Sequence, residues 1–262
     1  MHHFRYITVS NGTSGLLLDS IEGPGSTRLR LLWCHAGSSS ILRAGHLAGT
    51  HFDEALARSD IAGLRYEIHF ELATSAEKFA PAWVPRLLPR VPDFRSKYGQ
   101  LTRATVLGVR LENLPLAYSW YTVRNLEEAR WLLVSAREFS DSDLRLELTA
   151  VQIGEAWLGA VVFRYQGVTQ RLNGLSRRVE IVDAGRTVQG KRRFAARASA
   201  GDLELMLEAE APLGDFVLLE DHGATRIQTT LFGDCEVRLR ASSAATPVTH
   251  RATRSCLLEL KS

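Results

Sequence analysis

Cysteine is scarce in this chain of 262 residues, which contains three, at Cys34, Cys235 and Cys256. The three are widely separated, and no two of them form a CxxC pair. The sequence therefore suggests neither a cysteine-based zinc site nor a disulfide framework. We expect three buried free thiols.

Long apolar runs are also missing, since no stretch approaches the roughly 20 apolar residues that a membrane-spanning helix needs. The first residues, from Met1 to Tyr6, lack the basic segment and apolar core that are typical of a secretion signal. We predict a cytoplasmic protein without a membrane span.

Charge of one sign is not in marked excess, because 32 basic residues stand against 29 acidic ones and the net charge is +3. The basic residues are spread along the chain and do not gather in a tail or a stripe. A nucleic acid is therefore not an expected partner.

Common catalytic signatures are absent. The sequence has no GxSxG nucleophile motif, no GxxxxGK[ST] phosphate-binding loop and no HExxH zinc motif. These absences argue against nucleoside triphosphatases, the common hydrolases and the common metalloenzymes. We expect no metal site and no cofactor.

Alternation of apolar and polar residues is the strongest signal that is present. Tyr66, Ile68 and Phe70 alternate with Glu67 and His69, as the buried and exposed faces of a strand require. The same alternation recurs in residues 144–148, 203–207 and 235–239. Glycine-containing turns separate the segments at intervals of about 8 to 12 residues, and many short strands at such spacing predict a sandwich or a barrel.

Helix competes with strand in two places. In residues 50–57, Thr50 is of the residue type that caps a helix and Asp53 follows three residues later, so a two-turn helix and an extended segment both stay open. In residues 125–137, Leu126, Ala129 and Leu133 have helical spacing, but Trp131 favours an extended segment. For the second segment we predict a short turn that leads into a strand.

Proline is concentrated in residues 74–100, which form the least strand-like part of the chain. Pro81, Pro85, Pro89 and Pro92 recur there at a spacing that a central strand does not tolerate. We predict an ordered crossover that joins an N-terminal lobe, residues 1–100, to a C-terminal lobe, residues 101–262.

Histidines and carboxylates gather in the N-terminal part, where His35, His46 and His51 are followed by Asp53 and Glu54. A histidine beside a carboxylate is the usual acid–base pair near neutral pH. The alternative is that these histidines lie at the surface and have no catalytic role. Their spacing does not favour a metal site made of three histidines.

Large aromatic residues with polar tips form a second cluster on several expected strands: Tyr118, Trp120, Tyr121, Trp131, Trp157 and Tyr165, with Arg124 directly after the first three. Such side chains are suited to line a deep apolar cavity that offers a few hydrogen-bond donors to a small molecule. The alternative is that they are the ordinary filling of a β core.

The order of these features resembles the hydroxyneurosporene synthase (carotenoid 1,2-hydratase)/AttH-like family. The resemblance rests on residues 69–72, the proline-rich residues 79–83, residues 100–108, residues 118–121 and residues 131–139, and it covers about residues 64–166. Similar proteins include tocopherol cyclase-like proteins and lipocalin-like Diels-Alderases. The resemblance implies two lipocalin-like β-barrel lobes in tandem, with an apolar site within or between them for a polyene or a polyketide-derived molecule.

Two positions differ from the pattern of the family. Ser119 precedes Trp120 where a histidine is frequent, and Gln166 follows Tyr165 where an aspartate would follow. These differences remove the usual proton donor, which leaves cyclisation or plain binding more open than hydration.

We therefore predict an all-β fold of two lipocalin-like lobes with few short helices. The expected function is a cofactor-independent enzyme that cyclises, isomerises or hydrates a hydrophobic small molecule. The alternatives are a non-catalytic carrier of a lipid-like or pigment-like ligand and an interaction module with filled barrels. The expected partner is the small molecule, and the formation of a homodimer is left open.

Two sets of site residues follow. Tyr121, Arg124 and Glu138 are the predicted catalytic residues, which would polarise a carbonyl or donate a proton. The predicted substrate-binding residues are Trp33, Tyr118, Trp120, Trp131, Trp157 and Tyr165.

Overall fold

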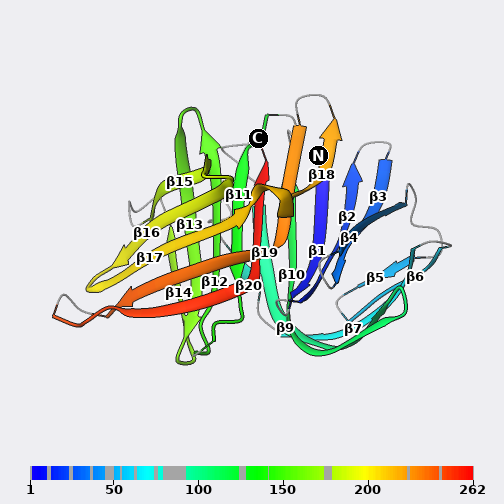
Figure 1. Ribbon diagram of the computed structural model, residues 1–262, viewed down its shortest axis with the longest axis horizontal. Helices are drawn as coiled ribbons and strands as arrows, with labels where there is room; N and C mark the ends of the chain where they lie inside the picture. Colours follow the sequence, from blue (N-terminus) through cyan, green and yellow to red (C-terminus); the bar gives the residue numbers. More distant parts are fainter. Residues whose placement is uncertain are drawn as a thin grey trace. The chain divides into compact units, whose positions relative to one another are not determined.

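Two compact units make up the computed structural model (Figure 1). The structure describes residues 2–10, 13–23, 26–35, 38–44, 50–53, 55–61, 64–73, 76–78, 93–123, 128–140, 142–173, 179–222, 225–241 and 244–261. Unit 1 holds the described residues up to 123, and unit 2 holds those from 128 onward.

Unit 1 is one antiparallel sheet. Its strands are β1 (His2–Ser10), β2 (Ser14–Gly23), β3 (Ser26–His35), β4 (Ser38–Ala44), β5 (Thr50–Phe52), β6 (Leu56–Ile61), β7 (Leu64–Leu72), β8 (Glu77–Lys78), β9 (Asp93–Val106) and β10 (Val109–Val123). The order across the sheet is β4-β3-β2-β1-β10-β9-β7-β6-β5, with β8 paired to β9. The strands thus follow an up-and-down path in which the first and last long strands, β1 and β10, pair with each other.

Unit 2 is a second antiparallel sheet. Its strands are β11 (Trp131–Ala136), β12 (Arg145–Ile153), β13 (Ala156–Tyr165), β14 (Val168–Asn173), β15 (Val179–Val188), β16 (Lys191–Ala200), β17 (Leu203–Pro212), β18 (Val217–His222), β19 (Thr225–Arg240) and β20 (Val248–Lys261). The order is β14-β13-β12-β11-β20-β19-β17-β16-β15, with β18 paired to β19.

The two units share one topology, because adding ten to every strand number of unit 1 reproduces the order of unit 2. In both units the first strand pairs with the last, and the eighth strand is a side branch. No repeat is evident in the residues themselves, so this duplication is visible only in the structure.

Each sheet buries alternate residues in one apolar core, which we call its inner face. In unit 1 this core combines residues of β3, such as Leu31, with residues of β7, such as Ile68. These strands lie near opposite ends of the sheet order, so the sheet curls around its core. In unit 2 the core includes Leu148 from β12 and Leu207 from β17.

The opposite side of each sheet, here called the second face, is also buried over its central strands. In unit 1 it carries Phe4, Tyr6, Asp19 and Tyr121, each at most 2 % exposed. A sheet that is solvated on one side would alternate buried and exposed residues there, whereas residues 116–119 of β10 are all buried.

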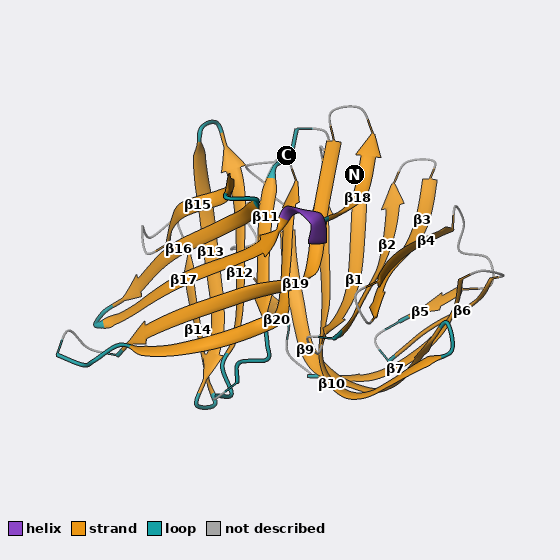
Figure 2. Cartoon of the chain, viewed as in Figure 1, coloured by secondary structure: helices purple, strands orange, loops and turns teal. Residues whose placement is uncertain are grey.

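The expected all-β class is confirmed, and the alternating segments 66–72, 144–148, 203–207 and 235–239 lie in or at the start of strands. The strand expected after the short turn is also present as β11. In the described part of the chain the only helix is the short 3-10 turn η2 (Leu213–Asp215), drawn in purple in Figure 2. No helix there has the length and apolar character needed to cross a bilayer.

The helix considered for residues 50–57 is wrong, because β5 and β6 occupy this segment. The Asp53 Oδ1 atom accepts hydrogen bonds from the amides of Ala55, at 2.7 Å, and Leu56, at 2.8 Å. Asp53 therefore closes a tight turn between two strands. In the helix that was considered, it would have belonged to the first turn. The three cysteines are buried free thiols, as predicted.

The boundary between the two lobes does not lie at residue 100, where the prolines led us to expect it. Residues 79–92, with the four prolines, lie outside the described residues. Asp93–Val106 forms the long strand β9, so position 100 lies inside a strand of unit 1, and β10 belongs to the same unit. No proline lies between Asp93 and Val106, and this stretch can pair along its whole length.

Gly99 marks a close approach of β9 to β7. A Cβ atom at this position would lie 1.9 Å from the carbonyl oxygen of Glu71. Replacing Gly99 with alanine is expected to lower the free energy of unfolding by about 1–3 kcal/mol, as forced overpacking does. Chemical denaturation followed by circular dichroism measures this change.

Gly214 provides the matched control for Gly99. A Cβ atom there meets nothing within 4 Å. Gly214→Ala is expected to change stability by less than about 0.5 kcal/mol. Equal unfolding midpoints for the two variants would contradict the close approach at Gly99.

Candidate functional site

A row of five polar side chains crosses the second face of unit 1. The strand register aligns them in the order Ser96 (β9), Ser119 (β10), Tyr6 (β1), Asp19 (β2) and Arg30 (β3). All five are at most 5 % exposed. Such a row is unusual, because buried polar groups must be matched with partners to offset their desolvation.

The side chains at both ends of this polar row form hydrogen bonds within the row. The hydroxyls of Ser96 and Ser119 are 2.8 Å apart and form a hydrogen bond. Arg30 Nε donates to the Asp19 carboxylate at 2.9 and 3.1 Å, and Arg30 Nη2 donates to the same group. The Asp19 carboxylate therefore accepts charge-assisted hydrogen bonds from a buried guanidinium.

An aromatic row lies beside the polar row on the same face. The register places Phe94, Tyr121 and Phe4 side by side on β9, β10 and β1. The Tyr121 ring stacks on both neighbours, with centroids 4.4 Å from Phe4 and 5.0 Å from Phe94. The three rings form a stack in which Phe4 and Phe94 cover the two faces of Tyr121.

The two rows meet at a pair of tyrosines. The hydroxyl of Tyr6, from the polar row, forms a hydrogen bond with the hydroxyl of Tyr121, from the aromatic row. Their ring centroids are 5.2 Å apart. In such a pair one hydroxyl donates its proton to the other.

Unit 2 has a buried polar group on its own second face. Trp131 Nε1 donates to Glu259 Oε1 at 2.8 Å, and Lys261 Nζ donates to the carbonyl oxygen of Ala129. Lys261 Nζ also lies 5.5 Å from the centroid of the Trp131 ring. Glu147 is buried on the same side of the sheet, across from Ser135. Asp19 of β2 and Glu147 of β12 are therefore buried carboxylates on strands that have the same place in the two sheets.

The predicted aromatic cluster is divided by the structure. Tyr121 lies in the aromatic row of unit 1, whereas Trp33, Tyr118 and Trp120 pack on the inner face of that unit. Trp131 lies on the second face of unit 2. Trp157 and Tyr165 pack at the edge of the unit 2 core.

The other two predicted catalytic residues are Arg124 and Glu138. Arg124 is outside the described residues. Glu138 follows β11 in unit 2 and is half-buried. Burial raises the pKa of Glu138, while the charge of Arg137 acts in the opposite direction.

Sequence reasoning missed Tyr6, Asp19 and Arg30. Asp19 had a signal, because it follows the apolar residues Leu16, Leu17 and Leu18 inside one strand. Arg30 had none, since its alternation with Leu29 and Leu31 is the pattern of an exposed strand position.

The predicted histidine cluster is only partly described. His51 Nε2 lies 2.7 Å from Asp53 Oδ2, and both side chains are more than half exposed. The His35 side chain and all of His46 and Glu54 lie outside the described residues. The described pair is a solvated surface contact, which contributes little to stability.

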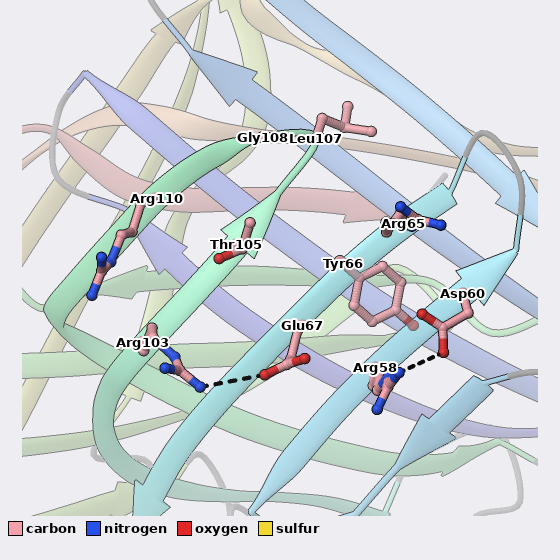
Figure 3. Close-up of a pocket in the computed structure, with 10 residues that line it drawn as sticks. All are labelled: Arg58, Asp60, Arg65, Tyr66, Glu67, Arg103, Thr105, Leu107, Gly108 and Arg110. Carbon is pink, nitrogen blue, oxygen red and sulfur yellow. Dashed lines mark hydrogen bonds and ion pairs between the residues drawn. The ribbon is translucent and has the colours of Figure 1, made fainter.

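A groove of about 670 Å³ lies on unit 1 (Figure 3). Its charged lining consists of four arginines and two carboxylates: Arg58, Asp60, Arg65, Glu67, Arg103 and Arg110. Arg58 pairs with Asp60 at 2.9 Å, and Arg103 pairs with Glu67 at 3.4 Å. These pairs engage two of the four arginines, so the lining of the groove keeps a net positive charge.

Several solved structures align with this chain along nearly its whole length. No protein-family model matches the sequence, and no curated protein does. Kievitone hydratase from Nectria haematococca aligns with a TM-score of 0.55 and 10 % identity, covering 100 % of this chain and 89 % of that one. CghA, in a crystal with Sch210972, aligns with a TM-score of 0.50 and 11 % identity, covering 99 % of this chain and 88 % of that one.

The two alignments span both units of this chain. The aligned proteins share its fold at low sequence identity. The prediction of two lipocalin-like lobes is confirmed. The resemblance inferred from the sequence is confirmed at the level of the fold.

Proposed function

We propose that this chain is a cofactor-independent enzyme for a hydrophobic, unsaturated small molecule of polyene, terpenoid or polyketide origin. The reaction is an isomerisation, a cyclisation or a hydration, and it takes place on the second face of unit 1. The observation that carries the proposal is the Tyr6–Tyr121 hydroxyl pair, which joins a buried polar row to a stacked aromatic row.

The aromatic row supplies binding and orientation. Phe4, Tyr121 and Phe94 form a rigid apolar stack that a conjugated substrate contacts at its edge. Holding a flexible substrate in a reactive conformer lowers the barrier by removing the entropy cost of reaching that conformer.

The tyrosine pair supplies the polar step. When the substrate is bound, a hydroxyl of the pair donates a hydrogen bond to a carbonyl oxygen of the substrate, and this hydrogen bond stabilises negative charge that develops there. Electron density is drawn from the neighbouring double bond, which then reacts more readily with an alkene of the same molecule or with water. Burial strengthens the hydrogen bond because the surroundings are of low dielectric.

Asp19 and Arg30 act as positioning residues in this scheme. Asp19 is the cross-strand neighbour of Tyr6, and Arg30 holds the Asp19 carboxylate from the other side. A buried ion pair is seldom retained for stability, since apolar residues of similar volume serve as well or better. Its presence beside the tyrosine pair favours a role in fixing the geometry of the polar row.

The shared fold gives further support. One protein with this fold is by name a hydratase, and another was crystallised with a small molecule, Sch210972. The fold is therefore compatible with both water addition and small-molecule binding. A carrier is the second candidate, because the aromatic row serves equally well to bind a ligand that leaves unchanged.

Native mass spectrometry after incubation with a cell extract tests the proposal, followed by chromatography of the released ligand. If the chain is an enzyme, the released product differs from the free ligand in one of two ways. It has the same mass and a new retention time, or its mass is larger by one water. An unaltered ligand would favour the carrier. The absence of any bound molecule would contradict both.

A further inference from the structure

The surface groove of unit 1 contains more positive than negative charge (Figure 3). Four arginines and two carboxylates line it, so its lining has a net charge of +2. All six charged side chains are at least partly exposed, and a dissolved molecule can therefore reach them. Four like charges in one small area repel one another, and a bound anion relieves this repulsion.

The strand register brings the charged side chains together from four adjacent strands. Arg58 of β6 lies opposite Glu67 of β7, which lies opposite Thr105 of β9. Thr105 in turn pairs with Arg110 of β10. Because directly opposite residues on neighbouring strands have their Cβ atoms about 5 Å apart, one row with an arginine at either end crosses the groove.

Arg65 is the arginine that the protein leaves available. Asp60 is its cross-strand neighbour, but the Asp60 carboxylate contacts Arg58 at 2.9 Å. Among the described residues, none forms an ion pair or a hydrogen bond with the Arg65 side chain (Figure 3). A guanidinium presents its N–H donors in a planar fork, which matches two oxygens of a phosphate group.

Two further arginines are held only by exposed carboxylates. The Glu67 carboxylate lies 2.6 Å from His69 and 3.4 Å from Arg103, so His69 is its nearer partner. Arg110 contacts Glu112, and these two side chains are 67 % and 43 % exposed. Exposed ion pairs contribute at most about 1 kcal/mol, so an anionic ligand can displace the carboxylates from these arginines.

The groove is larger than an inorganic ion needs. Its volume of about 670 Å³ is in the usual range for a pocket that binds a whole small molecule. Leu107 and Gly108 of the lining form the turn between β9 and β10, with φ angles of 49° and 84° that are typical of a tight hairpin. Leu107 is 44 % exposed and offers an apolar contact. We therefore expect a ligand with an apolar body attached to its anionic group.

A phosphate group fits this lining better than other common anions. A phosphate monoester has a charge of about −1.5 to −2 near pH 7 and three acceptor oxygens, which serve several arginines at once. A carboxylate has less charge and two oxygens. A nucleic acid is disfavoured, because Asp60 and Glu67 interrupt the basic surface and would repel successive phosphates.

We propose that the surface groove of unit 1 binds a small molecule through a phosphate monoester group. Arg65 is the first contact of the phosphate, and the neighbouring arginines donate to its remaining oxygens. The groove lies apart from the tyrosine pair, because Arg110 and Tyr121 are eleven residues apart on one strand, β10. It is a second site, and it does not depend on the proposed function.

Phenyl phosphate is the probe for this site, and phosphorus NMR of the probe measures its dissociation constant for the full chain. Benzoate and phenol, added as competitors, report the binding of a carboxylate and of the neutral ring. Wild-type protein is expected to bind phenyl phosphate about 10-fold more tightly than benzoate, because the phosphate accepts more charge-assisted hydrogen bonds, and not to bind phenol. Added NaCl is expected to weaken the binding, since salt screens exposed charges.

Two pairs of variants, each with one member in unit 2, test the role of the groove. Arg65→Gln is expected to weaken binding about 10-fold, because a charge-assisted hydrogen bond is lost. Arg197→Gln removes an equally exposed arginine from β16 and is expected to leave the binding unchanged. Asp60→Asn is expected to tighten binding about 3-fold, since a carboxylate that competes for Arg58 is neutralised. Asp202→Asn makes the same change of charge in an exposed turn and is expected to have no effect.

Three further ligands identify the source of the phosphate group. Inorganic phosphate, vesicles that contain phosphatidic acid and an RNA oligonucleotide are each expected to bind more weakly, per phosphate group, than phenyl phosphate. Equal or tighter binding of any of them would overturn the assignment to a small molecule.

The site itself would be overturned by three results. These are no binding of phenyl phosphate, equal affinity for phenyl phosphate and benzoate, or an Arg65→Gln variant that binds as well as Arg197→Gln. None of these measurements involves turnover, so this proposal and the proposed function can fail separately.

Discussion

Replacing Asp19 with alanine is expected to lower the free energy of unfolding by about 3–5 kcal/mol. The change removes the carboxylate that Arg30 contacts through Nε and Nη2 and leaves the guanidinium, 2 % exposed, without this partner. Breaking one half of a buried ion pair costs this much because the remaining charge is desolvated and uncompensated. Urea denaturation followed by tryptophan fluorescence measures the loss.

Two comparisons separate this effect from a general sensitivity to charge. Arg193 and Glu208 form a pair at 2.7 Å on the exposed side of unit 2, and Glu208→Ala is expected to cost at most about 1 kcal/mol. The double variant Asp19→Leu with Arg30→Met is expected to recover most of the stability lost in Asp19→Ala. If Asp19→Ala were as stable as Glu208→Ala, the buried pair would not have the energetic role described here.

Replacing Tyr121 with phenylalanine is expected to lower kcat by about 100-fold or more if the second face is catalytic. Phenylalanine keeps the stacking on Phe4 and Phe94 and removes only the hydroxyl that meets Tyr6. The loss of one preorganised donor to a developing oxyanion typically costs 10²- to 10³-fold. Initial rates on the ligand identified by native mass spectrometry measure the change.

The control for this variant is Tyr165→Phe, which removes a tyrosine hydroxyl from the edge of the unit 2 core. It is expected to keep the wild-type rate. A rise in KM with an unchanged kcat in Tyr121→Phe would assign the hydroxyl to ground-state binding, in disagreement with the proposed polar step.

The fold was predictable because strand alternation and turn spacing are local signals. Tyr66, Ile68 and Phe70 are all buried, as their alternation with charged residues requires. The segment 50–57 was ambiguous for a local reason as well, since an aspartate after a threonine suits both a helix cap and an Asx turn. Only the pairing of β5 with β6 distinguishes the two.

The candidate site was less predictable because it depends on register. Tyr118, Trp120 and Tyr121 are close in sequence, and a one-residue step along a strand changes the face. Tyr121 therefore lies with Phe4 and Phe94, which are distant in sequence, and not with Tyr118. Tyr6, Asp19 and Arg30 become neighbours only through the pairing of β1, β2 and β3.

The pairing of first and last strands has a consequence for how each unit is made. In unit 1, β1 is synthesised before β10, with which it pairs. In unit 2, β11 is likewise synthesised before β20, and the two strands pair from Trp131 and Lys261 onward. Until the later strand has been synthesised, one edge of the earlier strand has no neighbour in its sheet and is open to contacts between nascent chains. Pairing over such long sequence separations is slow, so refolding from denaturant should be limited by the meeting of these strands. Aggregation during synthesis should accordingly depend on how soon β10 and β20 are synthesised after their partner strands, β1 and β11.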